Sequence, residues 1–293
     1  MSDLPELLWS PAPDARQRTA MGRFLAAVER DLGRTFTGYD DAWRWSVEDP
    51  GAFWVAVWTF FEATTGLPPA PALASASMPG ATWFPGAALN WAERVLAMPG
   101  RSGSDEVVVG VSQTRDRVAL TADELRDAVA RCRAGLIRLG VRRGDRVAAY
   151  LPNIPETVIA VLATASLGAT WTSCAPEFGT RAVVDRLAQV EPVVLLAVDG
   201  YRYGDRPIDR AAEVAAIRAA LPSLRATVVV PYLRPAENDA LAAVPGAVAW
   251  SALLADTVDP AHERQEGHGQ NLLAGTRVTC KFGVDPGGLA CPP

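Results

Sequence analysis

From residue 105 onwards, short apolar runs alternate with longer helical segments. Apolar runs of four to seven residues are typical of buried strands, and apolar residues spaced three or four apart are typical of amphipathic helices. We expect strands at 107–111, 117–120, 146–151, 169–172, 192–198 and 226–230, and helices at 121–139, 155–167, 179–189 and 209–221. Strands that alternate with helices form βαβ units, so the pattern predicts an α/β fold with a mostly parallel sheet flanked by helices.

The clearest of these helices begins at a capping box. Thr121 and Glu124 have the spacing in which each side chain bonds the other residue's backbone N–H. The apolar residues that follow form one stripe, which includes Cys132 and ends before Gly140. We therefore expect Cys132 to be a packing residue rather than a nucleophile.

The first 104 residues have a different character and are rich in Trp, Pro and Gly. Asp49 and Pro50 predict the start of a helix that runs to Glu62, and its aromatic residues lie on nearly every face. We expect this helix to be largely buried, with its aromatic rings packed in a core rather than stacked on a ligand. A Pro- and Ala-rich connector at 67–78 and a short helix near 90–96 follow.

The chain is predicted to have three parts: an N-terminal segment at 1–104, an α/β domain at 105–255 and a tail at 256–293. The tail contains both histidines, the single lysine and two of the four cysteines, and it has no helical or strand period of useful length. We expect it to lie outside the preceding domain and to be disordered.

Composition narrows the functional classes. The 293 residues carry 28 basic and 33 acidic side chains, for a net charge of −5, which argues against a general nucleic-acid binder. Four cysteines in so long a chain do not suggest a secreted disulfide scaffold. The start of the sequence does not resemble a signal peptide, and the longest apolar stretch, 158–171, is too short to span a membrane. We expect a cytoplasmic protein without a membrane partner.

In an open α/β sheet, ligands bind beyond the carboxyl ends of the strands, so the loops at 152–156, 173–179 and 199–206 are the candidates. In the first loop, Asn153 is expected to cap the next helix, with Pro155 in the first turn. In the second loop, Cys174 lacks an evident base, because the histidines lie in the tail. We therefore expect Cys174 to be inert.

The third loop is the most charged. Arg202 and Arg206 stand among two glycines and two tyrosines, and guanidinium groups bind phosphate oxygens through paired donors. The same arginines could instead form an exposed salt-bridge cluster with Asp199, Asp205 and Asp209, and the sequence leaves both interpretations open. The nucleotide-loop, nucleophile-elbow and zinc-site patterns are missing, so no catalytic or metal-binding residue is assigned.

Several segments closely resemble the acetoacetate–CoA ligases, which belong to the adenylate-forming synthetase superfamily. The resemblance covers about Leu8 to Leu254 and is carried by residues 78–93, 150–160, 166–179 and 198–204. It implies the first half of a large adenylation domain, preceded by an acyl-CoA-synthetase N-terminal segment. The family is a ligase of lipid and ketone-body metabolism, which converts ATP, acetoacetate (or a similar short acid) and CoA, with Mg²⁺, into acetoacetyl-CoA, AMP and diphosphate.

The chain also departs from that family. The family places a Ser/Thr/Gly-rich loop ending in lysine, an adenine motif and a lysine-bearing C-terminal domain after the segments that match. None of these occurs here, and Lys281 stands in no matching context. The resemblance therefore implies an N-terminal fragment that is inactive alone, and we expect it to bind neither ATP, CoA nor Mg²⁺ tightly. Two alternatives stay open: a non-catalytic CoA- or nucleotide-binding module, and an inert truncated product.

The resemblance suggests cofactor-binding residues in two loops. In related acetyl-CoA synthetases, the segment that aligns with residues 200–206 contacts the phosphorylated ADP end of CoA through two arginines. Arg202 matches the first arginine, Asp205 stands where the second would be, and Arg206 is offset by one. The loop near the pantetheine arm corresponds to Phe178 and Gly179. The candidate contacts are thus Arg202, Gly204, Arg206, Phe178 and Gly179.

Overall fold

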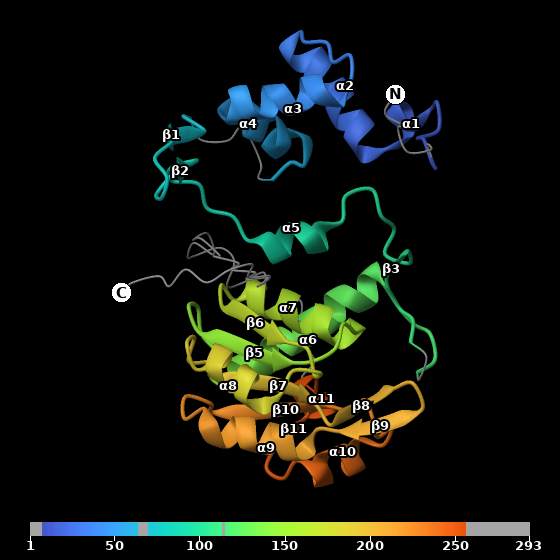
Figure 1. Cartoon of the computed structure of the whole chain (residues 1–293), viewed down its shortest axis with the longest axis vertical. Helices are drawn as coiled ribbons and strands as arrows, with labels where there is room; N and C mark the ends of the chain where they lie inside the picture. Colours follow the sequence, from blue (N-terminus) through green and yellow to red (C-terminus); the bar gives the residue numbers. More distant parts are fainter. Residues whose placement is uncertain (1–7, 64–69, 113–114, 256–293) are drawn as a thin grey trace, which may run out of the picture. The chain divides into compact units, whose positions relative to one another are not determined.

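The chain forms two compact units, residues 1–89 and residues 90–293 (Figure 1). The structure is a computed structural model that describes residues 8–63, 70–112 and 115–255. The expected tail and both histidines lie outside the described residues, as do the single lysine and the cysteines of the tail.

Unit 1 is a small helical unit with a short ribbon. Its elements are α1 (Ala15–Arg18), α2 (Ala20–Leu32), α3 (Tyr39–Glu48), α4 (Pro50–Phe60), β1 (Leu73–Ser75) and β2 (Thr82–Trp83), with the two strands antiparallel. Phe24, Val28, Phe36 and Trp45 form its core. Phe24 and Phe60 meet edge to face with their ring centroids 5.4 Å apart, and Phe36 and Trp45 form a tilted pair.

Helix α4 begins as predicted, because Asp49 accepts a hydrogen bond from the Ala52 amide and Pro50 occupies the first turn. The prediction that this helix is largely buried is wrong. Only Trp58 is buried, while Trp54 is 46% exposed and Phe61, just beyond the helix, is 62% exposed. Phe53 and Phe60 of α4 do pack against the core of unit 1, as expected, but the neighbours of α4 in this small unit leave Trp54 exposed.

Unit 2 is built on a five-stranded sheet in which every paired strand is parallel to its neighbour. Its strands are β5 (Arg146–Tyr150), β6 (Thr170–Cys174), β7 (Val194–Val198), β10 (Ala226–Val230) and β11 (Val248–Ala249), in the order β11-β10-β7-β5-β6. Its helices are α5 (Trp91–Ala97), α6 (Ala122–Arg138), α7 (Pro155–Ser166), α8 (Thr180–Leu187), α9 (Ala211–Ala220), α10 (Glu237–Ala243) and α11 (Trp250–Leu253). Two antiparallel ribbons complete it: β3 (Glu106–Gly110) with β4 (Val118–Thr121), and β8 (Gly200–Tyr203) with β9 (Arg206–Asp209).

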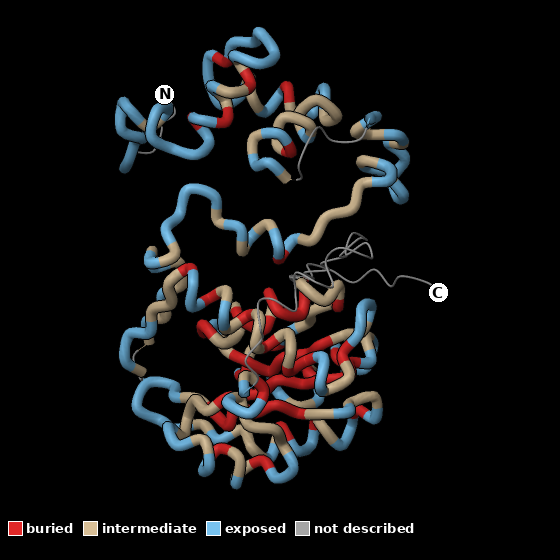
Figure 2. Tube along the Cα trace, turned by 180° about the vertical axis from the view of Figure 1, so that it is seen from behind, coloured by how far each residue is buried: buried red, intermediate tan, exposed pale blue. Residues whose placement is uncertain are grey.

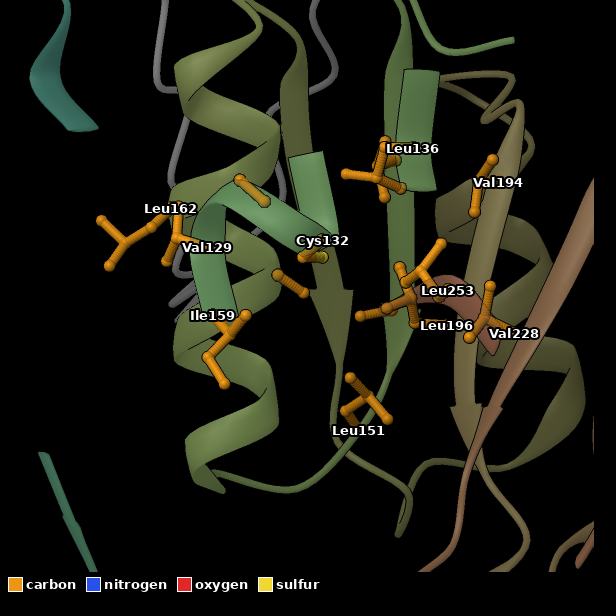
Figure 3. Packing of buried hydrophobic residues seen from close by; sticks show 14 of the residues in the cluster. Val129, Cys132, Leu136, Leu151, Ile159, Leu162, Val194, Leu196, Val228 and Leu253 are labelled. Atoms are coloured by element: carbon orange, nitrogen blue, oxygen red, sulfur yellow. The ribbon is translucent and has the colours of Figure 1, made fainter. Parts of the chain in front are cut away.

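The central strands β5, β7 and β10 are buried on both faces of the sheet (Figure 2). Successive side chains of each strand point to opposite faces, and each face is covered by helices. Along β7, Val194, Leu196 and Val198 pack against α6, α7 and α11, and Figure 3 shows this cluster from close by. Leu195 and Ala197 pack against α8, α9 and α10. The continuous apolar run of β7 therefore serves two cores at once.

The predicted α/β fold with a parallel sheet is confirmed, and the expected strands and helices of 105–230 fall where the sequence places them, to within a few residues at each end. Thr121 and Glu124 form the predicted capping box. Cys132 is fully buried, and burial raises the pKa of its thiol to about 12, so it is a packing residue. The segment after β7 was expected to be a loop and is instead the ribbon β8–β9.

The strand order defines a specific edge of the sheet. Numbered along the chain, the five strands lie in the order 2-1-3-4-5, so the connections leave β5 and β7 toward opposite sides. In open α/β sheets, the crevice at such a switch point, beyond the carboxyl ends of the strands, is the usual ligand site. Here that edge lies at the ends of β5 and β7.

None of the helices in the described part of the chain is both long and apolar enough to cross a bilayer.

Gly135 of α6 lies directly against α11. A Cβ atom at this position would lie 2.1 Å from the Leu253 carbonyl oxygen. We expect Gly135→Ala to push α11 away and to lower the free energy of unfolding by about 1–3 kcal/mol, the usual cost of overpacking. Urea unfolding followed by circular dichroism measures this loss.

Gly51→Ala is the matched control, because the nearest atom to its added Cβ would lie 3.7 Å away. The same chemical change in an open helical position should be neutral or stabilising. Equal midpoints for wild type and Gly135→Ala would show that α11 does not pack closely on α6.

Candidate functional site

The candidate loops meet at one edge of the sheet. Tyr150, the last residue of β5, pairs with Cys174 at the end of β6 and with Ala197 near the end of β7. The loop at 175–179 follows β6 and the ribbon β8–β9 follows β7, so the two leave the same edge of the sheet on either side of β5, next to the switch point.

Asp199 fixes the direction of the chain after β7. Its side chain is fully buried, and one carboxylate oxygen accepts hydrogen bonds from the Tyr232 and Leu233 amides at 2.8 and 3.0 Å. The other oxygen accepts from the Arg234 amide at 2.9 Å and forms an ion pair with the Arg234 guanidinium at 3.2 Å. The carboxylate thus holds the start of the ribbon against the loop that follows β10.

Arg234 also holds the other end of the ribbon through an ion pair with Asp209. Burial raises the pKa of Asp209, but the Ala211 amide and the Arg234 guanidinium outweigh it, so this pKa lies below its ordinary value. Gly200 is required where the ribbon starts, because a Cβ there would lie 2.5 Å from the Ile208 carbonyl oxygen. The base of the ribbon is therefore fixed on both strands.

The ribbon carries its two candidate arginines on opposite faces. Arg202 pairs with Pro207, and Tyr203 pairs with Arg206 across a two-residue turn that includes Gly204, whose φ is 57°. Residues directly opposite each other share a face, and neighbours along a strand alternate. Arg206 therefore shares the face of Tyr201 and Tyr203, and Arg202 lies on the other face.

Both candidate arginines are exposed. Within the described residues neither forms an ion pair, and Arg202 makes one long hydrogen bond, 3.5 Å, to the Asp205 carbonyl oxygen. Asp199 and Asp209 bind Arg234 instead. The salt-bridge cluster considered for Arg202 and Arg206 is therefore not formed, and most of their N–H donors face solvent.

The side chain of Tyr150, at the end of β5, contacts the backbone of the 175–179 loop. Its hydroxyl lies 2.7 Å from the carbonyl oxygens of both Pro176 and Phe178. Burial raises the pKa of Tyr150 to about 12, although the nearby Arg210 charge opposes this shift. The phenol therefore stays protonated and can donate.

The side chains of this loop remain accessible. The Phe178 ring is 41% exposed and lies beneath the Arg186 guanidinium, 4.5 Å from it. Gly179 precedes α8, and a Cβ added there would meet no protein atom within 4 Å. Burial raises the pKa of Cys174 against the opposing effect of Arg186, so its thiol is not activated, in agreement with the prediction that it is inert.

The first candidate loop has a structural role, but through residues other than those expected. Ile154, not Asn153, is the N-cap of α7, and no side chain caps that helix; Pro155 occupies the first turn as predicted. Glu156 forms an ion pair with Arg115 at 2.9 Å, and the Arg115 guanidinium lies over the Tyr232 ring. The prediction of an Asn153 cap is therefore wrong, because the extended Ile154 occupies that position.

Sequence reasoning missed the residues that hold the site together, namely Tyr150, Arg210 and Arg234. Tyr150 and Arg210 both contact Pro176, and Arg234 contacts Asp199 and Asp209. Each of these partners lies 25 to 35 residues away in the chain, so no local spacing reveals the contacts. The one signal available was Asp199, a charged residue directly after a fully apolar strand. Such a carboxylate needs partners when buried.

The described residues contain no cluster of three His, Cys, Asp or Glu side chains that could hold a metal ion. An apolar groove of about 680 Å³ lies between α2 and α4 of unit 1, and none of the candidate residues lines it.

Two family models match the chain. The model described as "AMP-binding enzyme" matches residues 99–269, which is more than half of the chain. The model described as "Acetyl-coenzyme A synthetase N-terminus" matches residues 39–95. The domain boundaries expected at 104 and 255 stay predictions beside these ranges.

Known proteins resemble the chain over most of its length. An acetoacetyl-coenzyme A synthetase of Rhizobium meliloti (strain 1021) is 38% identical over 77% of this chain, and an acetoacetyl-CoA synthetase of Macaca fascicularis is 34% identical over 85%. The solved structure of an acetoacetyl-CoA synthetase from Streptomyces lividans matches 87% of this chain, with a TM-score of 0.78 and 44% identity. This chain spans only 34%, 37% and 39% of those three proteins, respectively.

Tyr150→Phe tests the hold on the 175–179 loop. Loss of the hydroxyl leaves the Phe178 carbonyl without this donor, so we expect about 1–2 kcal/mol less stability at pH 7, measured by urea unfolding. Because folding raises the pKa of Tyr150 from 10.0 to about 12, the wild type loses this advantage as the pH rises from about 10 towards 12.

The difference between wild type and Tyr150→Phe should therefore narrow over that pH range, since Phe has no proton to lose. A difference that stays constant up to pH 12 would show that the hydroxyl is not buried as described.

Proposed function

The chain belongs to the AMP-binding enzyme family, and from this premise we propose that its 293 residues are the N-terminal part of an acetoacetate–CoA ligase. The overall reaction would join acetoacetate, or a similar short acid, to CoA while ATP is converted to AMP and diphosphate. Three observations support the proposal: the names of the similar proteins, the N-terminal family model and the 44% identity to a solved acetoacetyl-CoA synthetase. The acidic net charge favours a small-molecule substrate over a nucleic-acid partner, and we place the enzyme in the cytoplasm as part of this proposal.

Within that enzyme, these residues would bind CoA rather than perform the chemistry. The residues present fit CoA, because Arg202 and Arg206 offer donors to phosphate and the space beside Gly179 is open. They do not fit ATP with Mg²⁺. The described residues hold no metal-ligand cluster, and the single lysine lies outside them.

The observation that carries this role is the position of the ribbon. Beyond the carboxyl end of β7, it presents two exposed guanidinium groups next to a loop with an accessible ring, Phe178. Because Arg202 and Arg206 lie on opposite faces, they would not grip one phosphate together. CoA carries a 3′-phosphate and a diphosphate, so each arginine can bind a different group. Gly204 forms the turn between them, and Phe178 and Gly179 would border the pantetheine arm.

The proposal predicts that the chain alone does not catalyse the reaction. The 293 residues, supplied with ATP, Mg²⁺, acetoacetate and CoA, should form no acetoacetyl-CoA above the uncatalysed background. Nothing in the printed sequence supplies the lysine-ended phosphate loop of the family, and loss of even one donor to the developing charge costs about 10²–10³ in rate. The Streptomyces lividans enzyme is the positive control, and a comparable rate from this chain would contradict the prediction.

The proposal also makes a prediction about CoA affinity, which isothermal titration calorimetry measures. We expect Arg202→Ala and Arg206→Ala each to weaken CoA binding by about five- to tenfold, as expected for loss of a charge-assisted hydrogen bond. Because the two side chains lie on opposite faces, the double variant should lose the product of the two factors. A double variant no weaker than either single variant would show that both arginines bind the same phosphate.

Gly179→Ala separates ligand approach from folding. Its backbone φ of −68° suits alanine and its Cβ would meet open space, so stability should change little. A loss of CoA affinity in this variant would support close approach of the ligand.

If the wild type binds no CoA at millimolar concentration, the proposed binding role is wrong and the chain is an inert part of the enzyme.

A further inference from the structure

We propose that Arg210 is a positioning residue that ties the ribbon β8–β9 to the 175–179 loop, so that the two regions act as one binding surface. The inference rests on the proposed function for its ligand, CoA, but its physical basis is independent of any ligand. Arg210 lies between the end of β9 and the start of α9, and its side chain is 16% exposed.

All three nitrogen groups of the Arg210 guanidinium are engaged, each with a different segment. Nε donates to the Pro176 carbonyl oxygen at 2.9 Å, in the 175–179 loop. Nη2 donates to the Tyr201 hydroxyl at 3.4 Å, in the ribbon, and the guanidinium lies 5.5 Å from the Tyr201 ring centroid. Nη1 forms an ion pair with Glu213 at 2.7 Å, within α9.

These contacts require a planar fork rather than a simple positive charge. The guanidinium donates in three fixed directions, whereas a lysine ammonium is a compact charge at the end of a flexible stem. Burial lowers the pKa of Arg210, but the hydrogen bonds to Glu213 and Tyr201 raise it by more. Its pKa therefore lies above the ordinary value, and the guanidinium stays charged.

The ribbon is thereby held from both faces. Asp199 and Arg234 fix its base on the side of the loop that follows β10. Arg210 contacts the opposite face, through Tyr201, which is also the face of Arg206. The Pro176 carbonyl receives both the Tyr150 hydroxyl and Arg210 Nε, so the loop is tied to β5 and to the ribbon at one atom.

Such a tie matters only for a ligand that reaches both regions. A ligand that spans two prearranged sites binds its second end at a high effective concentration, and loss of the arrangement removes that advantage. A fragment that touches one region alone does not depend on it. Removal of Arg210 should therefore weaken binding of intact CoA and leave the binding of its two halves unchanged.

The first experiment uses the free chain and hydrogen–deuterium exchange. Arg210→Ala should speed amide exchange at least tenfold in both 175–179 and 201–208, and Arg210→Lys should restore protection only in part. Arg218→Ala is the matched control. Arg218 lies within α9 and, like Arg210, donates to a backbone carbonyl oxygen, but its partners are Pro245 and Gly246, so its loss should leave the ribbon unchanged.

The second experiment measures affinity by calorimetry for CoA, adenosine 3′,5′-bisphosphate and pantetheine. We expect Arg210→Ala to weaken CoA binding about tenfold, with the two fragments unaffected and Arg218→Ala equal to wild type. Equal losses for CoA and for either fragment would overturn the positioning role, because Arg210 would then contact the ligand directly.

The two arms separate the failures. If the wild type binds no CoA, the proposed function fails, and the exchange comparison still decides whether Arg210 joins the two regions. If Arg210→Ala changes exchange in neither region, or in the ribbon alone, the positioning inference is wrong whatever CoA does.

Discussion

The buried carboxylate of Asp199 is the contact on which the rest of this edge depends. A charged group without exposure is tolerated only when its oxygens are satisfied, and here three consecutive backbone amides and one guanidinium satisfy them. Those amides belong to the loop after β10, so one side chain couples the exits of two adjacent strands. The ribbon starts one residue later and inherits its direction from that coupling.

The arginines of this edge fall into two physical classes. Arg210 and Arg234 use their donors on carbonyl oxygens, a hydroxyl and carboxylates of the protein itself. Arg202 and Arg206 are exposed and leave most of their donors to solvent. In the sequence the four are indistinguishable, because each stands among glycine, proline, tyrosine or aspartate. Only the partners that folding supplies separate a guanidinium that builds the site from one that is free to bind a ligand.

The sheet and its helices could be predicted because their signals are local. The run from Val194 to Val198 is apolar throughout, and such a run between turn residues indicates a strand buried on both faces. The ribbon at 200–209 carries no such signal, since its residues are mostly glycine, tyrosine and charged side chains and it is fixed by Arg234 from another loop. The exposure of Trp54 was equally hidden, because sequence shows which faces are apolar but not how many neighbours a small unit can provide.

The candidate site was predictable in outline for a related reason. A parallel sheet places its ligand loops at the carboxyl edge, so 173–179 and 199–206 could be chosen without coordinates, and the family resemblance selected residues within them. The geometry between those residues could not be obtained that way. The alternation that separates Arg202 from Arg206 depends on a pairing register, and the link through Arg210 depends on a contact between residues 34 positions apart. A family resemblance can therefore identify which residues belong to a site, but it does not show whether two of them can bind the same group. Arg202 matches the first arginine of the family's pair, but Arg206, offset by one residue from the second, lies on the other face of the ribbon.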